Sequence, residues 1–151
     1  QKTQAVKDFG NGLQELVQKM IPTMRVKDGV GLAAPQVGFS QRVAVVEFAP
    51  SSEQSDIPPI PLTVLVNPKI ISHNNKTIVA EEGCLSLPEI NLQVPRYEKV
   101  KVLYWDTDGK RRKVKASGLF ARALQHEIDH LDGILITDRA IETKESEATQ
   151  E

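Results

Sequence analysis

The segment from Ser117 to Gly133, SGLFARALQHEIDHLDG, constrains the fold more than any other part of this chain. Serine caps helix N-termini, and glycine suits the position just after a helix C-terminus, so the segment predicts one helix. Its apolar residues fall on two opposite sides: Leu119 and Ala123 on one, and Phe120, Leu124, Ile128 and Leu131 on the other. A helix that is apolar on two sides is buried between layers.

This helix carries the motif His126-Glu127-Ile128-Asp129-His130, an HExxH pattern. At about 100° per residue, His130 lies about 40° around the helix from His126 and one turn further along, so both imidazoles can reach one ion. Glu127 then lies beside the ion, where a general base would act on a bound water. HExxH fixes only three positions and arises by chance on exposed helices. A buried histidine pair, however, needs polar partners or a metal, so the apolar pattern favours a metal site.

Two imidazoles do not complete a catalytic metal site, which normally has three protein ligands. In the longer pattern HExxHxxGxxH a third histidine follows; here Gly133 matches, but Ile136 stands at the ligand position. Asp138 and Glu142 follow the helix closely, which leaves little chain in which to turn back. Cys84, the one cysteine, can be a small buried hydrophobe, a nucleophile paired with a histidine, or a thiolate ligand. Spacing alone leaves these alternatives open.

The rest of the chain predicts strands and one further helix. Apolar spacing indicates an amphipathic helix over residues 13–24, in which Pro22 predicts a kink or an early end near Ile21. A small-residue loop is expected over 29–38. The expected strands are 42–48, 62–66, 69–72 (after a break at Asn67-Pro68), 77–80, and a hairpin of 92–105 with 110–115 around Asp108-Gly109. The fold class is therefore α+β, with antiparallel sheet segments around a buried C-terminal helix that bears HExxH.

Composition limits the classes of partner. The chain of 151 residues has a formal net charge of −1, which argues against a general nucleic-acid binder, including DNA. No apolar run reaches the roughly 18 residues that span a membrane, and a single cysteine cannot form an internal disulfide. Residues 96–115 nevertheless carry eight basic and three acidic side chains. This local excess of positive charge indicates either a solvated hairpin face or a contact with RNA. We expect residues 1–151 to form a single catalytic domain whose acidic tail, from about residue 142, is frayed.

Three segments together resemble one family. GVGLAAPQVG (29–38), EGCLS (82–86) and QHEIDHLDG (125–133) are similar, in this order, to the three signature motifs of peptide deformylase. The resemblance implies that Cys84, His126 and His130 bind one divalent metal ion, with Fe(II) as the native ion and Zn(II) or Ni(II) as substitutes. It also implies that Glu127 is the catalytic acid and base.

The resemblance assigns further roles around the metal. The side-chain amide of Gln36 and the backbone N–H of Leu85 would donate to the formyl oxygen of the substrate. Gly31 and Gly83 would flank the bound peptide, where a Cβ atom would obstruct the approach of two backbones. Val30 would line the pocket for the first side chain of the substrate. The implied reaction removes the formyl group from the N-terminal methionine of newly made polypeptides and releases formate.

Several expectations follow from this hypothesis. The partners are N-formylmethionyl peptides and nascent chains, with transient ribosome contact and without DNA or membrane. Glu82 and Arg96 are expected to form a buried ion pair behind the ligand loop. The location is the cytoplasm, or an organelle with bacterial-type translation if an N-terminal transit segment is missing. Two alternatives remain: a zincin-like metallopeptidase, which would tolerate loss of Cys84, and a non-catalytic metal-stabilised binding domain that docks on RNA.

Overall fold

The strands form two antiparallel sheets in the computed structural model. The structure describes residues 2–26, 30–50, 56–84 and 87–141, and for residues 84 and 87–90 it describes the backbone but not the side chains. Five strands pair in the order β1-β2-β3-β6-β7: β1 (Gly31–Ala33), β2 (Val43–Phe48), β3 (Ile60–His73), β6 (Lys99–Trp105) and β7 (Arg111–Ser117). The second sheet is a hairpin of β4 (Thr77–Cys84) and β5 (Leu87–Tyr97).

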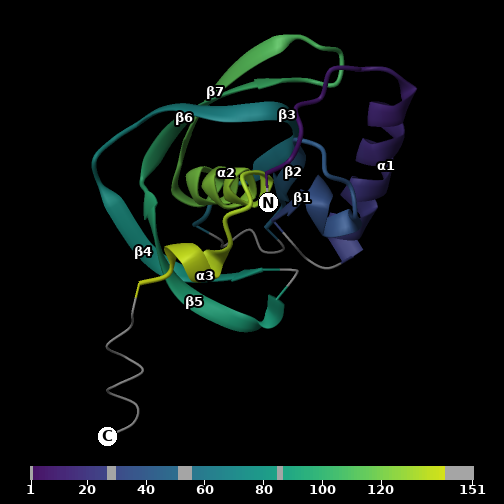
Figure 1. Ribbon diagram of the computed structural model, residues 1–151. Helices are drawn as coiled ribbons and strands as arrows, with labels where there is room; N and C mark the ends of the chain where they lie inside the picture. Colours follow the sequence, from purple (N-terminus) through teal and green to yellow (C-terminus); the bar gives the residue numbers. More distant parts are fainter. Residues whose placement is uncertain (1, 27–29, 51–55, 85–86, 142–151) are drawn as a thin grey trace, which may run out of the picture.

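Helix α2 (Gly118–Leu131) runs through the middle of the molecule, with the five-stranded sheet on one side and the β4–β5 hairpin on the other (Figure 1). Leu124 is fully buried and lies in one apolar cluster with Val46 and Val102 of the sheet. Gly133 follows the helix with φ 76°, the left-handed conformation that ends helices and that glycine adopts without strain. The predicted α+β fold with an enclosed C-terminal helix is confirmed.

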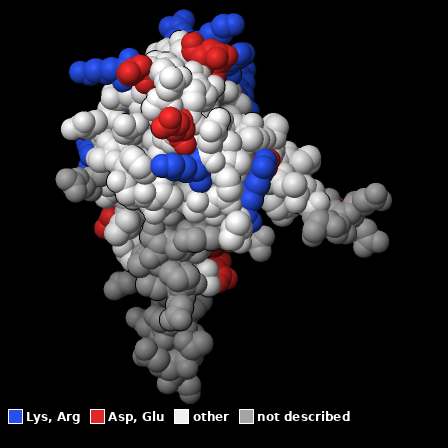
Figure 2. All heavy atoms as spheres, turned by 90° about the vertical axis from the view of Figure 1, so that its right-hand side faces the viewer, with Lys and Arg blue, Asp and Glu red and all other residues white. Residues whose placement is uncertain are grey.

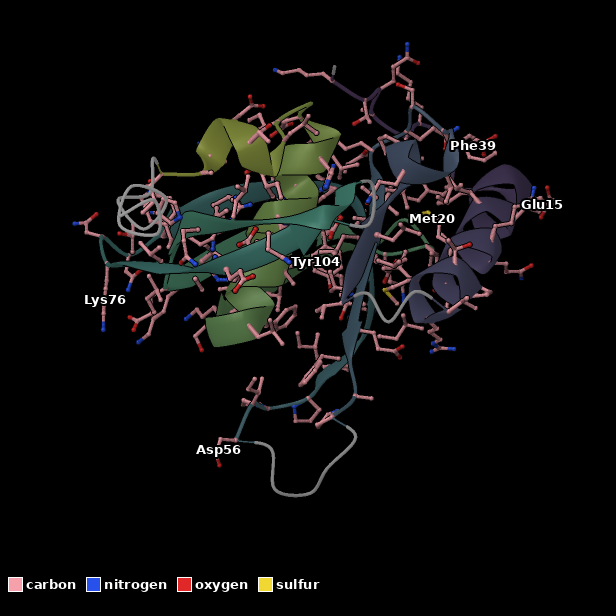
Figure 3. The ribbon with its side chains drawn as sticks, turned by 90° about the horizontal axis from the view of Figure 1, so that it is seen from below. Glu15, Met20, Phe39, Asp56, Lys76 and Tyr104 are labelled. Carbon is pink, nitrogen blue, oxygen red and sulfur yellow. The ribbon has the colours of Figure 1, made fainter. Side chains whose placement is uncertain are left out.

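Helix α1 (Asn11–Val26) covers the opposite face of the sheet from α2. Side chains alternate along a strand, so Val43 and Val45 of β2 pack toward α1 while Val46 packs toward α2. Met20 of α1 is fully buried and points toward the sheet, whereas Glu15 points away into solvent (Figure 3). Each face of β2 therefore has a helix to bury it.

Of the two outcomes predicted at Pro22, a kink or an early end near Ile21, the early end was wrong, because α1 continues through this residue to Val26. Proline removes one backbone hydrogen bond, but Pro22 lies on the exposed side of α1, where water can satisfy the carbonyl that loses its donor. Met24, one turn beyond Met20, is fully buried and fixes the last turn of the helix to the core. Packing therefore outweighs the local cost of the proline.

The predicted break at Asn67-Pro68 was also wrong, because residues 60–73 form the single strand β3. The sheet absorbs the irregularity as a register shift against β6, and Asn67 has a φ of 51° there. Its side chain accepts a hydrogen bond from the backbone N–H of Val6 (2.7 Å) and donates one to the Val6 carbonyl (2.9 Å). Pro68 lacks an N–H, and a bulge is where a strand tolerates that loss.

The remaining differences are smaller. The predicted loop over 29–38 contains strand β1 and the 3₁₀ helix η1 (Ala34–Val37), and the stretch 92–105 is divided between β5 and β6. A short helix, α3 (Ile136–Arg139), follows α2 and packs against β5. The tail from residue 142 lies outside the described residues. Among the helices that are described, none has the length and apolar character needed to cross a membrane.

Candidate active site

The two histidines of the HExxH motif lie together on α2, with ring centroids 4.9 Å apart. His130 is buried, and the His126 side chain is only 13% exposed. Nδ1 of His126 lies 2.8 Å from Oε1 of Glu82 on β4. An ionised carboxylate only accepts hydrogen bonds, so this contact makes Nδ1 the protonated nitrogen and leaves the lone pair on Nε2. That is the tautomer a metal-binding histidine requires.

Glu82 is the centre of a buried group of charges. Arg96 on β5 donates to both of its carboxylate oxygens, each at 3.0 Å, and both residues are less than 10% exposed. Burial raises the pKa of Glu82, but the hydrogen bonds from His126 and Arg96 outweigh it and lower the pKa to about 2. Although burial lowers the pKa of Arg96, its bonds to Glu82 and Asp129 raise it above the ordinary value. The expected Glu82–Arg96 pair is therefore present, and Glu82 is ionised at neutral pH.

The charged group extends along α2 beyond the expected pair. Nη1 of Arg96 donates to Oδ2 of Asp129 at 2.5 Å, and Arg139 of α3 donates to both oxygens of Asp129 at 3.0 and 3.1 Å. Asp129 is the fourth residue of HExxH and is buried. The helix that carries the histidines is thus anchored by ion pairs to β5 and to α3.

Two further residues of α2, which sequence reasoning did not single out, hold the β4–β5 hairpin. Arg122 donates to Oε2 of Glu82 and to the carbonyls of Val94 and Ile78. Gln125 accepts from the N–H of Tyr97 (2.8 Å) and donates to its carbonyl (2.9 Å). The sequence signal was the narrow polar stripe on a helix predicted to be buried, because polar groups enclosed there require partners.

Glu127 faces β1. It is 4% exposed, and its carboxylate lies against the backbone of Gly31, where an added Cβ atom would be 2.5 Å from Oε2 and 2.8 Å from Cγ. No side chain larger than hydrogen fits at Gly31 without displacing Glu127. The glycine of the first motif and the glutamate of the third, far apart in sequence, therefore meet here.

Gln36 and Val30 flank this contact from either end of β1. Oε1 of Gln36 accepts a hydrogen bond from the N–H of Ala33 at 2.8 Å, which fixes the orientation of the side-chain amide in η1. The 3₁₀ helix η1 packs against α2. Val30 packs against the apolar cluster around α2, and its carbonyl accepts from the N–H of Glu47 at 2.9 Å. Both residues thus adjoin the strand whose Gly31 meets Glu127.

The second motif is described only in part. Gly83 lies opposite Asn91 in the β4–β5 hairpin, and the register shifts between Gly83 and Cys84, where β4 ends. The thiol of Cys84 and all of Leu85 lie outside the described residues. The structure therefore places the backbone of Gly83 and Cys84 at the end of the strand that carries Glu82, and the roles of the thiol and of Leu85 stay predictions.

The donor chemistry of the described residues fits a divalent transition metal. Two imidazoles one helical turn apart, one oriented by a carboxylate, are typical ligands of zinc and iron. Among the described side chains alone, no three His, Cys, Asp or Glu residues form a metal-binding group. The third predicted ligand is the undescribed thiol of Cys84, which would add a soft donor that zinc and ferrous iron both accept.

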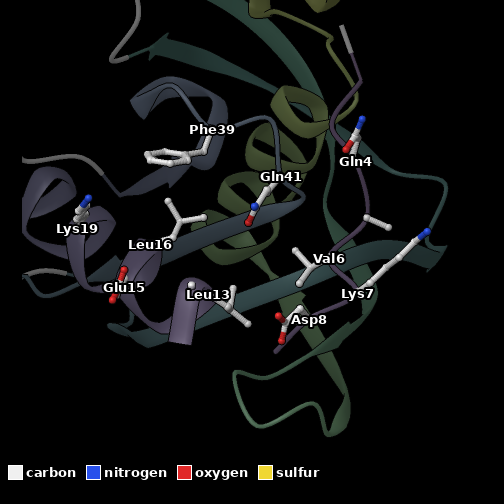
Figure 4. A pocket seen from close by; sticks show the side chains of 12 residues that line it. Gln4, Val6, Lys7, Asp8, Leu13, Glu15, Leu16, Lys19, Phe39 and Gln41 are labelled. Atoms are coloured by element: carbon white, nitrogen blue, oxygen red, sulfur yellow. The ribbon is translucent and has the colours of Figure 1, made fainter. Parts of the chain in front are cut away.

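A cavity of about 890 Å³ lies elsewhere, between the N-terminal segment and the first turns of α1 (Figure 4). Lys7, Lys19, Asp8 and Glu15 line it together with apolar residues of α1, and no predicted site residue lines it. Positive and negative side chains are also interspersed over the molecular face that includes α1 (Figure 2). This mixture of charges gives the cavity no preference for one class of ligand.

Comparisons with known proteins agree on one family. The family model described as polypeptide deformylase matches residues 1–146. Peptide deformylase of Salinibacter ruber is 42% identical over 142 residues, which cover 91% of this chain and 72% of that protein. Neither the metallopeptidase nor the non-catalytic alternative is favoured by these matches.

Solved structures give the same result. The peptide deformylase of Synechococcus elongatus in complex with actinonin matches with a TM-score of 0.86 and 37% identity, covering 99% of this chain and 80% of that one. The Met-Ala-Ser-bound class I type b peptide deformylase of Acinetobacter baumannii matches with a TM-score of 0.85 and 40% identity, covering 91% and 88%. The fold, the three motifs and the sequence matches together show that the chain belongs to the peptide deformylase family.

Proposed function

We propose that this chain removes the formyl group from the N-terminal methionine of newly made polypeptides with the residues placed around α2. Cys84, His126 and His130 would hold one divalent ion, and residues 1–151 would act as a single catalytic domain. Family membership supports metal-dependent hydrolysis of N-formyl groups. The observation that carries the assignment of residues is the contact between the backbone of Gly31 and the carboxylate of Glu127.

That contact brings a strand that can pair with a peptide beside a group that can move a proton. When bound, the divalent ion would acidify water and polarise the formyl oxygen. Glu127 takes a proton from the attacking water on its carboxylate and returns it to the nitrogen of the departing peptide. Gly31 and Gly83 allow the substrate backbone to approach on both sides, because neither has a Cβ.

The remaining residues orient the substrate. The Gln36 amide, whose oxygen is held by the N–H of Ala33, directs its N–H₂ group toward the formyl oxygen, and the backbone N–H of Leu85 donates to the same atom. Val30 supplies apolar surface for the methionine side chain. Glu82, acting on Nδ1 of His126, is a positioning residue that keeps the ligating nitrogen in place.

On the family resemblance we propose Fe(II) as the native ion. Zn(II) and Ni(II) are substitutes, because imidazole and thiolate donors accept all three. The substrates are N-formylmethionyl peptides and nascent chains, so the protein works where translation occurs, in the cytoplasm or in an organelle with bacterial-type translation, in transient contact with the ribosome. The Met-Ala-Ser peptide in the Acinetobacter baumannii structure supports the substrate class.

The test measures formate released from formyl-Met-Ala-Ser by protein loaded anaerobically with Fe(II), Ni(II) or Zn(II). Release by the loaded wild type and loss of release in Glu127→Gln with unchanged metal content support the proposal. No release with any of the three metals, or full release by Glu127→Gln, would refute it. Cleavage of internal amide bonds that survives Cys84→Ala would favour a metallopeptidase instead.

A further inference from the structure

One cation of α2 lies beside the predicted metal ligands. Arg122 is four residues before His126, so the two side chains lie on the same face of the helix, one turn apart. His126 contacts Oε1 of Glu82 through Nδ1, and Nη1 of Arg122 donates to Oε2 of the same carboxylate. The helix therefore holds Glu82 at two points, which are about 6 Å apart along its axis.

The orientation of the Glu82 carboxylate is fully determined by its partners. Arg96 donates Nη2 to Oε1 and Nε to Oε2, each at 3.0 Å. With the contacts of His126 and Arg122, each oxygen takes part in two hydrogen bonds, which use the four lone-pair positions of an ionised carboxylate. Rotation of the carboxylate would break several of these bonds at once. Two guanidinium groups thus set the direction from which Glu82 meets Nδ1 of His126.

The two arginines have different consequences for the site. Arg96 lies on β5 and also donates to Asp129, so its removal would disturb a second buried carboxylate. Arg122 lies on α2 itself, and its side chain is 14% exposed. Its bond therefore fixes Glu82 relative to the helix that carries the two predicted histidine ligands.

Arg122 also fixes the path of the β4–β5 hairpin. Nη1 donates to the carbonyl of Val94 on β5 at 3.0 Å, and Nη2 donates to the carbonyl of Ile78 on β4. Ile78 is four residues before Glu82, so the contacts of Arg122 span about 13 Å of the strand that ends at Cys84. A guanidinium group is planar, with donors in fixed directions, so it sets the direction of β4 as well as its distance from α2.

Gln125 provides an internal comparison. It also attaches α2 to the hairpin, because it accepts from the N–H of Tyr97 and donates to the carbonyl of Tyr97. Gln125 and Arg122 thus each make two bonds to the backbone of the hairpin, and of the two Arg122 also contacts Glu82. Comparing these two residues separates attachment of the hairpin from control of Glu82.

We propose that Arg122, which lies outside the three motifs, is a positioning residue of the metal centre. Acting through Glu82, it holds Nε2 of His126 in the orientation that binds the ion, and it holds the end of β4 in a fixed place against α2. The inference rests on the proposed function, because it takes Cys84, His126 and His130 as the ligands. It goes further in assigning to Arg122 how tightly, and in what geometry, the ion is bound.

The test compares loss of Co(II) from loaded Arg122→Met and Gln125→Met in excess EDTA. Methionine is unbranched and flexible, so it fills much of the space of either side chain without making its hydrogen bonds. Groups that orient a metal ligand contribute about 10–100-fold to affinity, so Arg122→Met should lose Co(II) about tenfold faster than the wild type. Gln125→Met leaves Glu82 and its partners in place and should stay within about twofold of the wild type.

The absorption spectrum of bound Co(II) is a second readout, because it reports the identity and geometry of the ligands. The bands should shift in Arg122→Met and stay unchanged in Gln125→Met, even where urea unfolding shows equal destabilisation of the two variants. Arg122→Lys keeps the charge without the planar group and should lose Co(II) about threefold faster than the wild type. This milder variant gives the same comparison if Arg122→Met fails to fold.

A double variant tests whether Arg122 acts through Glu82. Arg122→Met should accelerate metal loss much less in the Glu82→Gln background than in the wild type, because effects on one network are not additive. Full additivity, equal acceleration in Arg122→Met and Gln125→Met, or a wild-type rate and spectrum in Arg122→Met would overturn the inference. Lack of formate release by the loaded wild type, or a Co(II) spectrum unaffected by Cys84→Ala, would instead refute the proposed function and its ligands.

Discussion

Replacing Gly31 with alanine is the most direct test of how the first and third motifs cooperate. The new Cβ would lie 2.5 Å from Oε2, 2.8 Å from Cγ and 2.9 Å from Cδ of Glu127. Carbon atoms in contact normally lie about 3.5–4.0 Å apart, so the Glu127 side chain must move by roughly 1 Å. The displacement involves Cγ and not only the carboxylate tip, and Glu127 is buried, so a simple rotation into solvent does not relieve it.

The expected effect falls on activity more than on stability. A misplacement of about 1 Å in a catalytic group can lower the rate about 100-fold, and we expect that loss in kcat/KM for Gly31→Ala. Overpacking against the buried Glu127 side chain costs about 1–3 kcal/mol, which lowers Tm by several degrees in a chain of this size. Gly31 does not have a positive φ, so its replacement introduces no backbone strain of its own.

The assay is formate release from formyl-Met-Ala-Ser by metal-loaded protein, with the metal content of each variant measured alongside. Gly12→Ala is the matched control, because an added Cβ there meets nothing within 4 Å and alanine suits a helix. It should retain full activity and equal or higher stability. Activity of Gly31→Ala within twofold of the wild type, at full metal content, would refute the argument that this contact sets the position of Glu127.

Three other perturbations give distinct outcomes. The pKa of Glu82 is about 2, below its ordinary value of 4.5, so its charge contributes stability above pH 4.5 that is lost as the pH falls toward 2. Glu82→Gln should therefore be less stable by about 3 kcal/mol at pH 7, and urea unfolding should show the difference shrinking over that range. Asn67→Ala should lower the free energy of unfolding by about 2–3 kcal/mol, because it loses both hydrogen bonds to Val6 and strains the backbone at the positive φ. Asn67→Gly loses the same two bonds but adopts the positive φ without strain, so it should cost less. Met20→Ala, at a fully buried position, should cost about 2–5 kcal/mol in the same assay.

The sequence was informative where one pattern decided the structure. The two-sided apolar pattern of residues 117–133 predicted an enclosed helix, and the left-handed Gly133 confirmed its end. Local rules failed where packing outweighed them. Pro22 does not end α1, because it is exposed and the buried Met24 holds the next turn. Asn67-Pro68 does not divide β3, because the sheet absorbs the extra residue as a bulge.

In the candidate site, too, local patterns predicted some features, whereas features that depend on packing were missed. Spacing alone placed His126 and His130 on one side of a helix, and the pairing of Glu82 with Arg96 was expected. The contact of Gly31 with Glu127 could not be derived from either segment, because it depends on how β1 packs against α2. The bonds from α2 to the β4–β5 hairpin were missed for the same reason.

Helix α2 contacts the two sheets in different ways, and this difference explains why polar and charged side chains of α2 are enclosed where it meets the β4–β5 hairpin. Toward the five-stranded sheet, α2 packs through a large apolar cluster. Toward the β4–β5 hairpin, the described apolar core is small, consisting of Val94 with Ile136 of α3 and their partly buried neighbours. Attachment of the hairpin therefore relies on the directional bonds made by Arg122 and Gln125.

Apolar packing tolerates small sliding movements, whereas charged hydrogen bonds fix distance and angle. Glu82 and Cys84 lie on the same strand, so the bonds that hold Glu82 against His126 and Arg122 also set where the end of β4 meets α2. A buried ion network adds little net stability over apolar residues of similar volume. The network lies between β4, which carries the predicted ligand Cys84, and α2, which carries His126 and His130. Its presence there is therefore better explained by the fixed distance and orientation it imposes on β4 and α2.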